Sequence, residues 1–190
     1  MKTALRASGV LLVVTALAAS GMLLLLITNL RTYSRLTYER PVATLEFEQR
    51  APQRYVATLT RLPGLETETF ELAGDEWQVD ARVLKWTGFA NVLGLDSRYR
   101  LERLAGRYRD IEQERTAPRS VYSLGKEPPI DLWELAKAHP SWFWFLDGLY
   151  GSATYLPMAN GAQYEVTLTQ SGLIARPRNP VAQAATSSWR

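Results

Sequence analysis

The chain has 190 residues, and its hydrophobic fraction of 46% is ordinary for a folded protein with one core. The absence of cysteine excludes disulfide bonds, thiol catalysis and thiolate metal sites. Five of the 22 basic residues but only one of the 19 acidic residues lie in the first 40 positions, so the remainder is about neutral. That balance argues against a nucleic-acid partner, which requires a basic face.

An apolar helix is the first predicted element. No charged residue lies between Arg6 and Arg31, and these 24 positions would form a helix about 36 Å long. A bilayer core is about 30 Å thick, so we predict an uncleaved transmembrane anchor at residues 8–30, after a short tail at residues 1–7. The alternative is a signal peptide cleaved after Ala18, which would leave the apolar run ASGMLLLLITNL as the new N-terminus.

The flanks of this helix predict its orientation and its contacts. Basic groups are nearly equal in number on the two sides, but a short leading tail usually stays in the cytoplasm. We therefore expect a bacterial inner-membrane protein with a cytoplasmic N-terminus and a periplasmic main domain. A polar stalk at residues 31–41 follows the anchor. Five residues are candidates for contact with a partner helix or with the membrane interface: Ala16, Ser20 and Gly21 as a small helix face, and Tyr33 and Tyr38 in the stalk.

Residues 42–176 are predicted to form a β-rich soluble domain. VATLEFEQ and RYVATLTR alternate with period two around RAPQ, which predicts a hairpin, and TFEL with EWQVDARV predicts a second pair around AGD. In the last of these segments Trp77, Val79, Ala81 and Val83 share one face. The phase changes at Leu84, which indicates a bulge or a strand end.

The second half of this domain mixes strands with a helical insertion. TGFANVLGLD is predicted as a connection, SRYRLERLAGRYRD as a strand, and residues 110–129 as a long loop. Two short helices near residues 130–150 precede the strands ATYLPM and QYEVTLTQ, and residues 177–190 are expected to be a flexible tail. We therefore expect a mainly β (α+β) fold, with a curled antiparallel sheet, a small barrel or sandwich, behind the N-terminal helix.

The helical insertion is rich in aromatic residues. Trp142, Phe145, Leu146 and Leu149 recur at helical spacing and predict a buried stripe on the second helix. Trp144 would point away from this stripe with Phe143 beside it. We interpret these two as an interface for a partner protein or for lipid, unless the loop at residues 110–129 covers Trp144.

Few residues are candidates for catalysis or for binding a metal or cofactor. His139, the single histidine, has Asp131, Ser141 and Asp147 nearby in sequence and is the best candidate for a general base. However, HPS is typical of a helix end, so we expect no catalytic role for it. No histidine or carboxylate spacing indicates a metal site and no glycine pattern indicates a phosphate loop, so we expect no cofactor.

An arginine-rich strand has two interpretations. Its arginines could bind an anion or a lipid headgroup, or they could form a solvated face that pairs with acids such as Glu76 and Asp80. We favour the paired face, because acidic residues balance the arginines locally. The arginines are Arg98, Arg100, Arg103, Arg107 and Arg109.

Three segments resemble a family of small, single-pass envelope proteins of Gram-negative bacteria: LKWTGFANVLGLDSRYRLERLAGRY, LDGLYGSATY and TQSGLIAR. The resemblance covers most of residues 40–176. Members of that family are sometimes labelled multidrug or cation efflux transporters. A single uncharged span cannot form an alternating-access path, so the resemblance implies at most an accessory subunit.

Three classes of function remain. The leading hypothesis is a non-enzymatic accessory or assembly subunit, bound through its anchor to the bilayer and to a larger integral membrane protein or complex. The alternative is a periplasmic module that binds a lipid or small ligand in a cavity between the sheet and the helical insertion. A hydrolase-type enzyme is third, since it would need polar residues that converge in a cleft.

Overall fold

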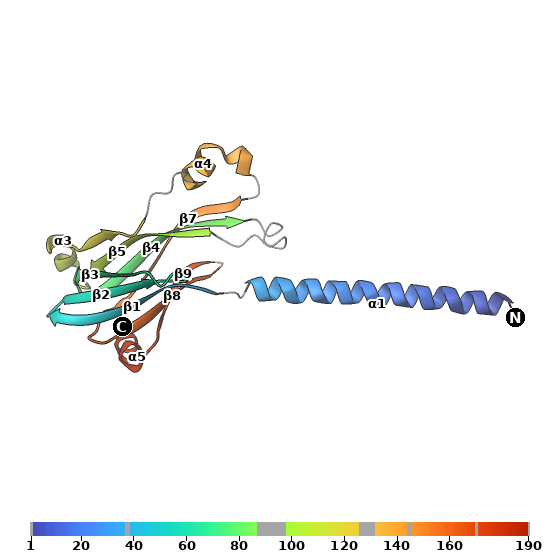
Figure 1. Ribbon diagram of the computed structural model, residues 1–190, viewed down its shortest axis with the longest axis horizontal. Helices are drawn as coiled ribbons and strands as arrows, with labels where there is room; N and C mark the ends of the chain where they lie inside the picture. The colour runs from blue at the N-terminus through green and yellow to red at the C-terminus, as the bar shows by residue number, and fades with distance from the viewer. Residues whose placement is uncertain are drawn as a thin grey trace. The chain divides into compact units, whose positions relative to one another are not determined.

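The computed structural model describes residues 2–36, 39–86, 98–125, 132–143, 146–169 and 171–189 (Figure 1). The chain divides into two compact units, Met1–Tyr38 and Glu39–Arg190. The whole predicted connection TGFANVLGLD, residues 87–96, lies outside the described residues.

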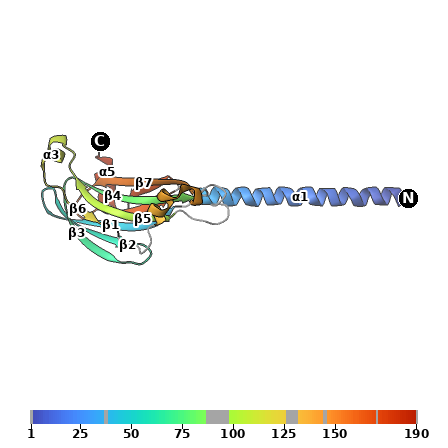
Figure 2. The same ribbon diagram turned by 90° about the horizontal axis from the view of Figure 1, so that it is seen from above.

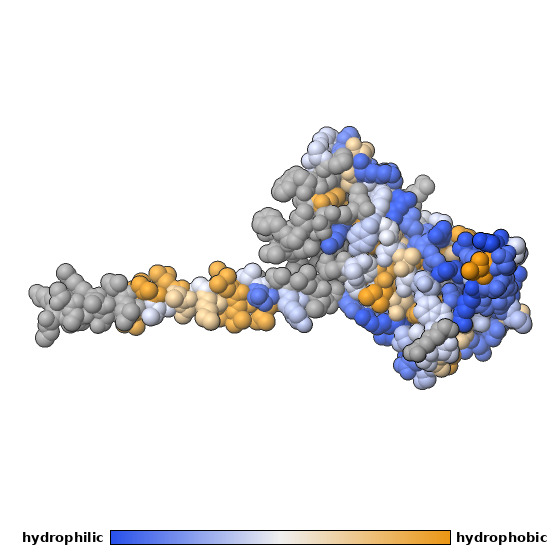
Figure 3. Space-filling model, turned by 180° about the vertical axis from the view of Figure 1, so that it is seen from behind, coloured by the Kyte–Doolittle hydropathy of each residue, from blue (hydrophilic) through white to orange (hydrophobic). Residues whose placement is uncertain are grey.

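The first unit is one helix, α1 (Lys2–Leu36). Its stretch Leu12–Leu30 is long and apolar enough to cross a membrane, and Figure 3 shows apolar side chains along it. The hydroxyls of Thr15 and Thr28 donate to the carbonyls of Leu12 and Leu24 at 2.9 and 2.8 Å. The helix thus satisfies these polar groups itself, as a hydrocarbon environment requires. RTYSRL, the first six residues of the predicted stalk, contains no helix breaker, and α1 continues through it.

The second unit is mainly β and consists of two antiparallel sheets (Figures 1 and 2). In the first sheet the order is β3 (Thr67–Ala73), β2 (Arg54–Arg61), β1 (Arg40–Ala51), β8 (Gln163–Thr169), β9 (Gly172–Pro177). In the second sheet it is β6 (Val121–Ser123), β5 (Arg98–Arg107), β4 (Glu76–Trp86), β7 (Leu146–Pro157). The antiparallel, mainly β prediction is confirmed. The two sheets do not close into a barrel. Strand β9 was not predicted.

The first predicted hairpin and the buried face of β4 are confirmed. Strands β1 and β2 pair with Leu45 opposite Leu59, and both side chains are buried. The face of β4 that begins at Trp77 is also buried, with every member at most 2% exposed. The pairing register between β4 and β7 shifts between Lys85 and Trp86, and β4 ends at Trp86, close to the predicted change of phase.

The predicted β3–β4 pair is wrong, because AGD is a crossing between sheets rather than a hairpin turn. Gly74 has φ of 132°, which favours glycine, and its N–H donates to the Gln53 carbonyl at 2.9 Å. A Cβ at Gly74 would lie 2.3 Å from the carbonyl oxygen of Arg107. A Cβ at Gly106 would lie 2.1 Å from that of Ala73. The ends of β3 and β5 therefore approach too closely for any side chain.

Three aromatic rings join the two sheets in the core. Trp77 of β4 has its ring centroid 6.1 Å from Phe47 of β1 and 5.4 Å from Tyr164 of β8. All three side chains are at most 1% exposed. The Tyr164 hydroxyl donates to the Pro157 carbonyl at 2.7 Å, which satisfies its polar group. Large rings in van der Waals contact contribute most of the apolar area that such a core buries.

The two-helix insertion is confirmed only for its first helix, α4 (Leu132–Ala138), where Ala136 is buried. A short 3-10 turn, η1 (Pro140–Phe143), follows, and the chain enters β7 at Leu146. The helical stripe is therefore wrong: Trp142 is 67% exposed, and Leu149 pairs opposite Leu84 of β4. Pairing along β4 provides more backbone hydrogen bonds than one further helical turn.

Two segments predicted to be irregular carry helices instead. The loop at residues 110–129 contains α3 (Ile111–Thr116) and β6. The tail forms α5 (Pro180–Ser187), in which the Asn179 side chain caps the helix by accepting from the Ala182 N–H at 2.9 Å. Ala182 is fully buried, so the tail is part of the folded unit.

A substitution at Gly106 tests the close backbone approach at which the chain crosses from one sheet to the other. We expect Gly106→Ala to lower the free energy of unfolding by about 3 kcal/mol, because its Cβ would force the backbones of β3 and β5 apart. Denaturant unfolding of the full chain in detergent measures this. Gly151→Ala is the control: it also lies in a strand of the second sheet, but its Cβ would meet no atom within 4 Å. Equal stability of the two variants would contradict the close approach.

Candidate functional site

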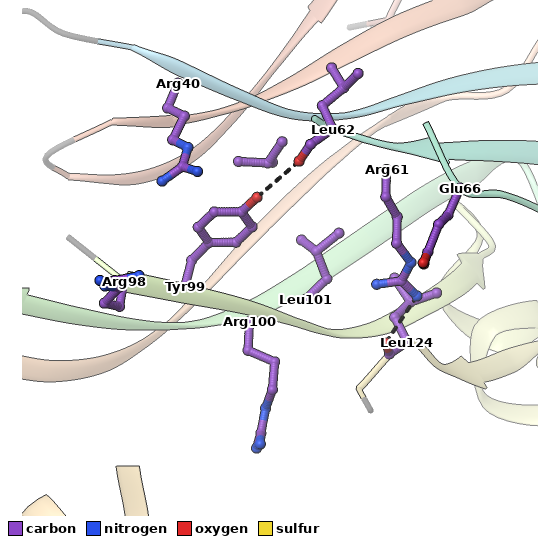
Figure 4. A pocket seen from close by; sticks show the side chains of 10 residues that line it. Arg40, Arg61, Leu62, Glu66, Arg98, Tyr99, Arg100, Leu101 and Leu124 are labelled. Carbon is purple, nitrogen blue, oxygen red and sulfur yellow. Dashed lines mark hydrogen bonds between the residues drawn. The ribbon is translucent and has the colours of Figure 1, made fainter. Parts of the chain in front are cut away.

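A cleft of about 520 Å³ opens where the beginning of β1 and the end of β2 face the beginning of β5 (Figure 4). It lies at the end of β5 away from Gly106. Its lining is rich in arginine: Arg40, Val42, Arg61, Leu62, Glu66, Arg98, Tyr99, Arg100, Leu101 and Leu124. The expected cavity between the sheet and the helical insertion is not this one, because α4 contributes none of these residues.

Two hydrogen bonds cross this cleft from one sheet to the other. The Tyr99 hydroxyl donates to the Leu62 carbonyl at 3.4 Å, and Arg61 Nη2 donates to the Leu124 carbonyl at 3.0 Å. Val42 and Leu101, at most 4% exposed, form an apolar floor with Leu124. The cleft therefore combines an apolar interior with a polar, cationic mouth.

The arginines of the cleft differ in their partners. Arg61 pairs with Glu68 at 3.0 Å, and Arg100 pairs with Glu102 and points away from the cleft in Figure 4. Arg40 points toward Tyr99, with its guanidinium carbon 5.7 Å from the ring centroid. Within the part of the chain that the structure describes, neither Arg40 nor Arg98 has a carboxylate partner.

Tyr99 is held as a neutral hydrogen-bond donor. Its burial raises the pKa of the phenol, and the positive charges of Arg40 and Arg61 oppose that shift. At neutral pH the hydroxyl remains protonated. Guanidinium groups beside apolar side chains make this site suited to an anion that carries apolar groups.

The rest of the arginine-rich strand forms ion pairs, as expected. Arg103 Nε lies 2.6 Å from Asp80. Arg109 Nε lies 3.3 Å from Glu76, which is only 5% exposed, and Arg107 lies 3.9 Å from it. Glu76 also accepts from Trp189 Nε1 at 2.6 Å, which fixes the end of the chain to β4. These contacts confirm the paired face for Arg103, Arg107 and Arg109.

His139 lies on the surface. Its ring stacks on that of Trp142 at 4.7 Å, and both side chains are exposed. Asp131, one of its proposed neighbours, lies outside the described residues. Among the described residues, no group of three His, Asp or Glu side chains could hold a metal ion.

The proposed interface residues are dispersed along the chain. Ala16, Ser20 and Gly21 lie exposed on α1, and a Cβ at Gly21 would meet no atom within 4 Å. Tyr33 is 67% exposed near the end of the same helix. Phe143 ends η1. Tyr38 and Trp144 lie outside the described residues, so their interface roles stay predictions.

Comparison with known proteins identified no relative. No protein family, no curated protein and no solved structure matches the chain.

The cleft could not be recognised from the sequence, because β5 lies in a different sheet from β1 and β2 and faces them only in the tertiary structure. One signal was available. Tyr99 and Leu101 alternate with Arg98 and Arg100, so the arginine-rich strand has an inward face as well as a solvated one.

The contact between Trp189 and Glu76 generates a prediction about the tail. We expect Trp189→Phe to lower the free energy of unfolding by about 2 kcal/mol, because a buried carboxylate loses one donor. Thermal unfolding of the full chain, followed by near-UV circular dichroism, measures this. Trp142→Phe, at an exposed ring, is the matched control and should change stability by less than about 0.5 kcal/mol. If the two variants unfold alike, the tail does not stabilise the fold.

Proposed function

We propose that this protein is a non-enzymatic, membrane-anchored accessory or assembly subunit of an inner-membrane protein complex. In this proposal α1 spans the bilayer with a cytoplasmic N-terminus. The β unit lies in the periplasm, with its two sheets packed face to face as a sandwich. A larger integral membrane protein or complex is the partner.

The observation that carries this proposal is the character of α1. Its stretch Leu12–Leu30 contains no ionisable side chain, and all its side chains are exposed. A helix of this kind in water would expose far more apolar surface than a soluble protein tolerates, whereas lipid or another helix can cover it. A helix without charges has no group for ion coupling, which favours a supporting role over transport.

The small residues of α1 favour association with another helix. Ala16 and Ser20 are one helical turn apart, and small residues at this spacing allow two backbones to approach closely in a membrane. The resemblance to single-pass envelope proteins agrees with such a role. Trp144 and Phe143 would then extend the interface beyond the bilayer.

A module that binds an anionic ligand is the second candidate, and the cleft between β1, β2 and β5 favours it. Ion pairs within the protein account for most arginines of the second sheet. Arg40 and Arg98 are the cations of the cleft for which the described residues provide no carboxylate. An accessory subunit and a ligand-binding module are compatible in one chain.

The proposed topology is tested by a reporter fused after Arg190, beyond α5. An alkaline phosphatase fusion, active only after export, should be active in intact cells, and a fluorescent protein that fails to mature outside the cytoplasm should be dark. Immunoblotting should show the fusion at full length and in the membrane fraction. Phosphatase inactivity would refute the orientation, and a shortened soluble product would identify the helix as a cleaved signal peptide.

The proposed partner contact is tested by adding bulk to the small face of α1. Ser20→Leu should reduce recovery of a stoichiometric membrane partner in mild detergent, because it prevents close helix approach. Ala18→Leu is the matched control, since Ala18 is two positions from Ser20 and therefore lies on nearly the opposite side of the helix. Quantitative mass spectrometry of both purified complexes measures the effect. A clean monomer from the wild-type chain, or equal loss in both variants, would contradict the proposal.

A further inference from the structure

We infer that the arginine-lined cleft binds the phosphate group of an anionic membrane lipid, such as phosphatidylglycerol. The inference shares the membrane anchor with the proposed function but does not depend on a partner protein. It rests on four features of the cleft: cations without carboxylate partners, a buried apolar floor, an exposed leucine beside the mouth, and closeness to α1 in sequence.

The cations decide the charge of the ligand. Arg40 and Arg98 contribute two positive charges that no described carboxylate neutralises, and Glu66 contributes one negative charge to the lining. Arg61 Nε is buried without a hydrogen-bond partner, although its Nη2 atom pairs with Glu68. Guanidinium groups bind phosphate oxygens with charge-assisted hydrogen bonds.

The apolar side chains favour a lipid over a free anion. Val42, Leu101 and Leu124 form the buried floor, which would contribute nothing to the binding of inorganic phosphate. Leu65, between lining residues Leu62 and Glu66, is 68% exposed and has φ of 55°. Leucine is disfavoured in this left-handed conformation, so an exposed leucine there points to contact with an apolar surface.

The sequence links the cleft to the proposed anchor. Only residues 37–39 separate the end of α1 from Arg40, the first residue of β1. If α1 spans the bilayer, so short a connection keeps Arg40 close to the headgroups. Basic residues near an anionic lipid surface are each attracted by about 1 kcal/mol, which corresponds to about a fivefold change in affinity.

Native mass spectrometry of the full chain in an uncharged detergent tests the inference. Phosphatidylglycerol and phosphatidylcholine are added separately at equal concentration, and the fraction of protein that retains each lipid is measured. We expect the wild-type chain to retain phosphatidylglycerol preferentially. Arg40→Gln/Arg98→Gln should reduce this preference by about thirtyfold, the combined effect of two basic residues.

The matched control is Arg50→Gln/Arg115→Gln. It removes the same charge from two exposed side chains that pair with Glu48 and Glu112, and neither residue lines the cleft. It should retain phosphatidylglycerol as the wild type does. Should the Arg40/Arg98 variant unfold, Arg98→Gln alone replaces it, with an expected loss of about fivefold.

Four results would overturn the inference. The first is no preference of the wild-type chain for phosphatidylglycerol. The second is a preference that survives in the cleft variant, which would place the lipid at the basic flanks of α1, and the third is an equal fall in the control. Displacement of the lipid by inorganic phosphate at equal concentration would assign the cleft to free phosphate. A loss confined to the cleft variant, with partner recovery unchanged, supports the inference independently of the proposed complex.

Discussion

The close approach of two backbones at Gly74 and Gly106 is the constraint on which the β unit depends. Because neither position can hold a side chain, the chain can pass from the end of β3 in the first sheet directly into β4 of the second. The N–H of Asp75 then donates to the Arg107 carbonyl at 2.8 Å, which fixes the corner. With the corner fixed, the inward faces of β1, β4 and β8 meet, and Phe47, Trp77 and Tyr164 pack between them.

This corner also explains why the cleft lies where it does. The sheets are in backbone contact at the last residues of β5, and the cleft opens at its first residues, Arg98 to Leu101. Strands twist relative to one another, so sheets that touch at one corner separate along their length. At the separated end Tyr99 and Arg61 reach across by hydrogen bonds from their side chains. Polar side chains thus occupy a position where apolar packing no longer fills the space between the sheets.

The distribution of arginines separates structural from functional charge. Arg103, Arg107 and Arg109 pair with acids on β4. One of these acids, Glu76, also accepts a hydrogen bond from Trp189 near the end of the chain. The buried carboxylate of Glu76 is compatible with the fold because several donors surround it. At the other end of β5, Arg40 and Arg98 have no carboxylate partner among the described residues, which supports the proposal that the cleft binds an anion there.

Local sequence patterns were sufficient to predict the apolar N-terminal helix, the β1–β2 hairpin, the buried face of β4 and the antiparallel, mainly β character. These features depend on local hydrophobic period, which the side chains carry directly. Four features became visible only in the folded chain: AGD crosses between sheets, Leu149 belongs to a strand, the tail folds against Glu76, and Arg40, Arg61 and Tyr99 meet in one cleft. Each of these depends on contacts between residues far apart in sequence, whose energies exceed local propensity and leave no periodic signal.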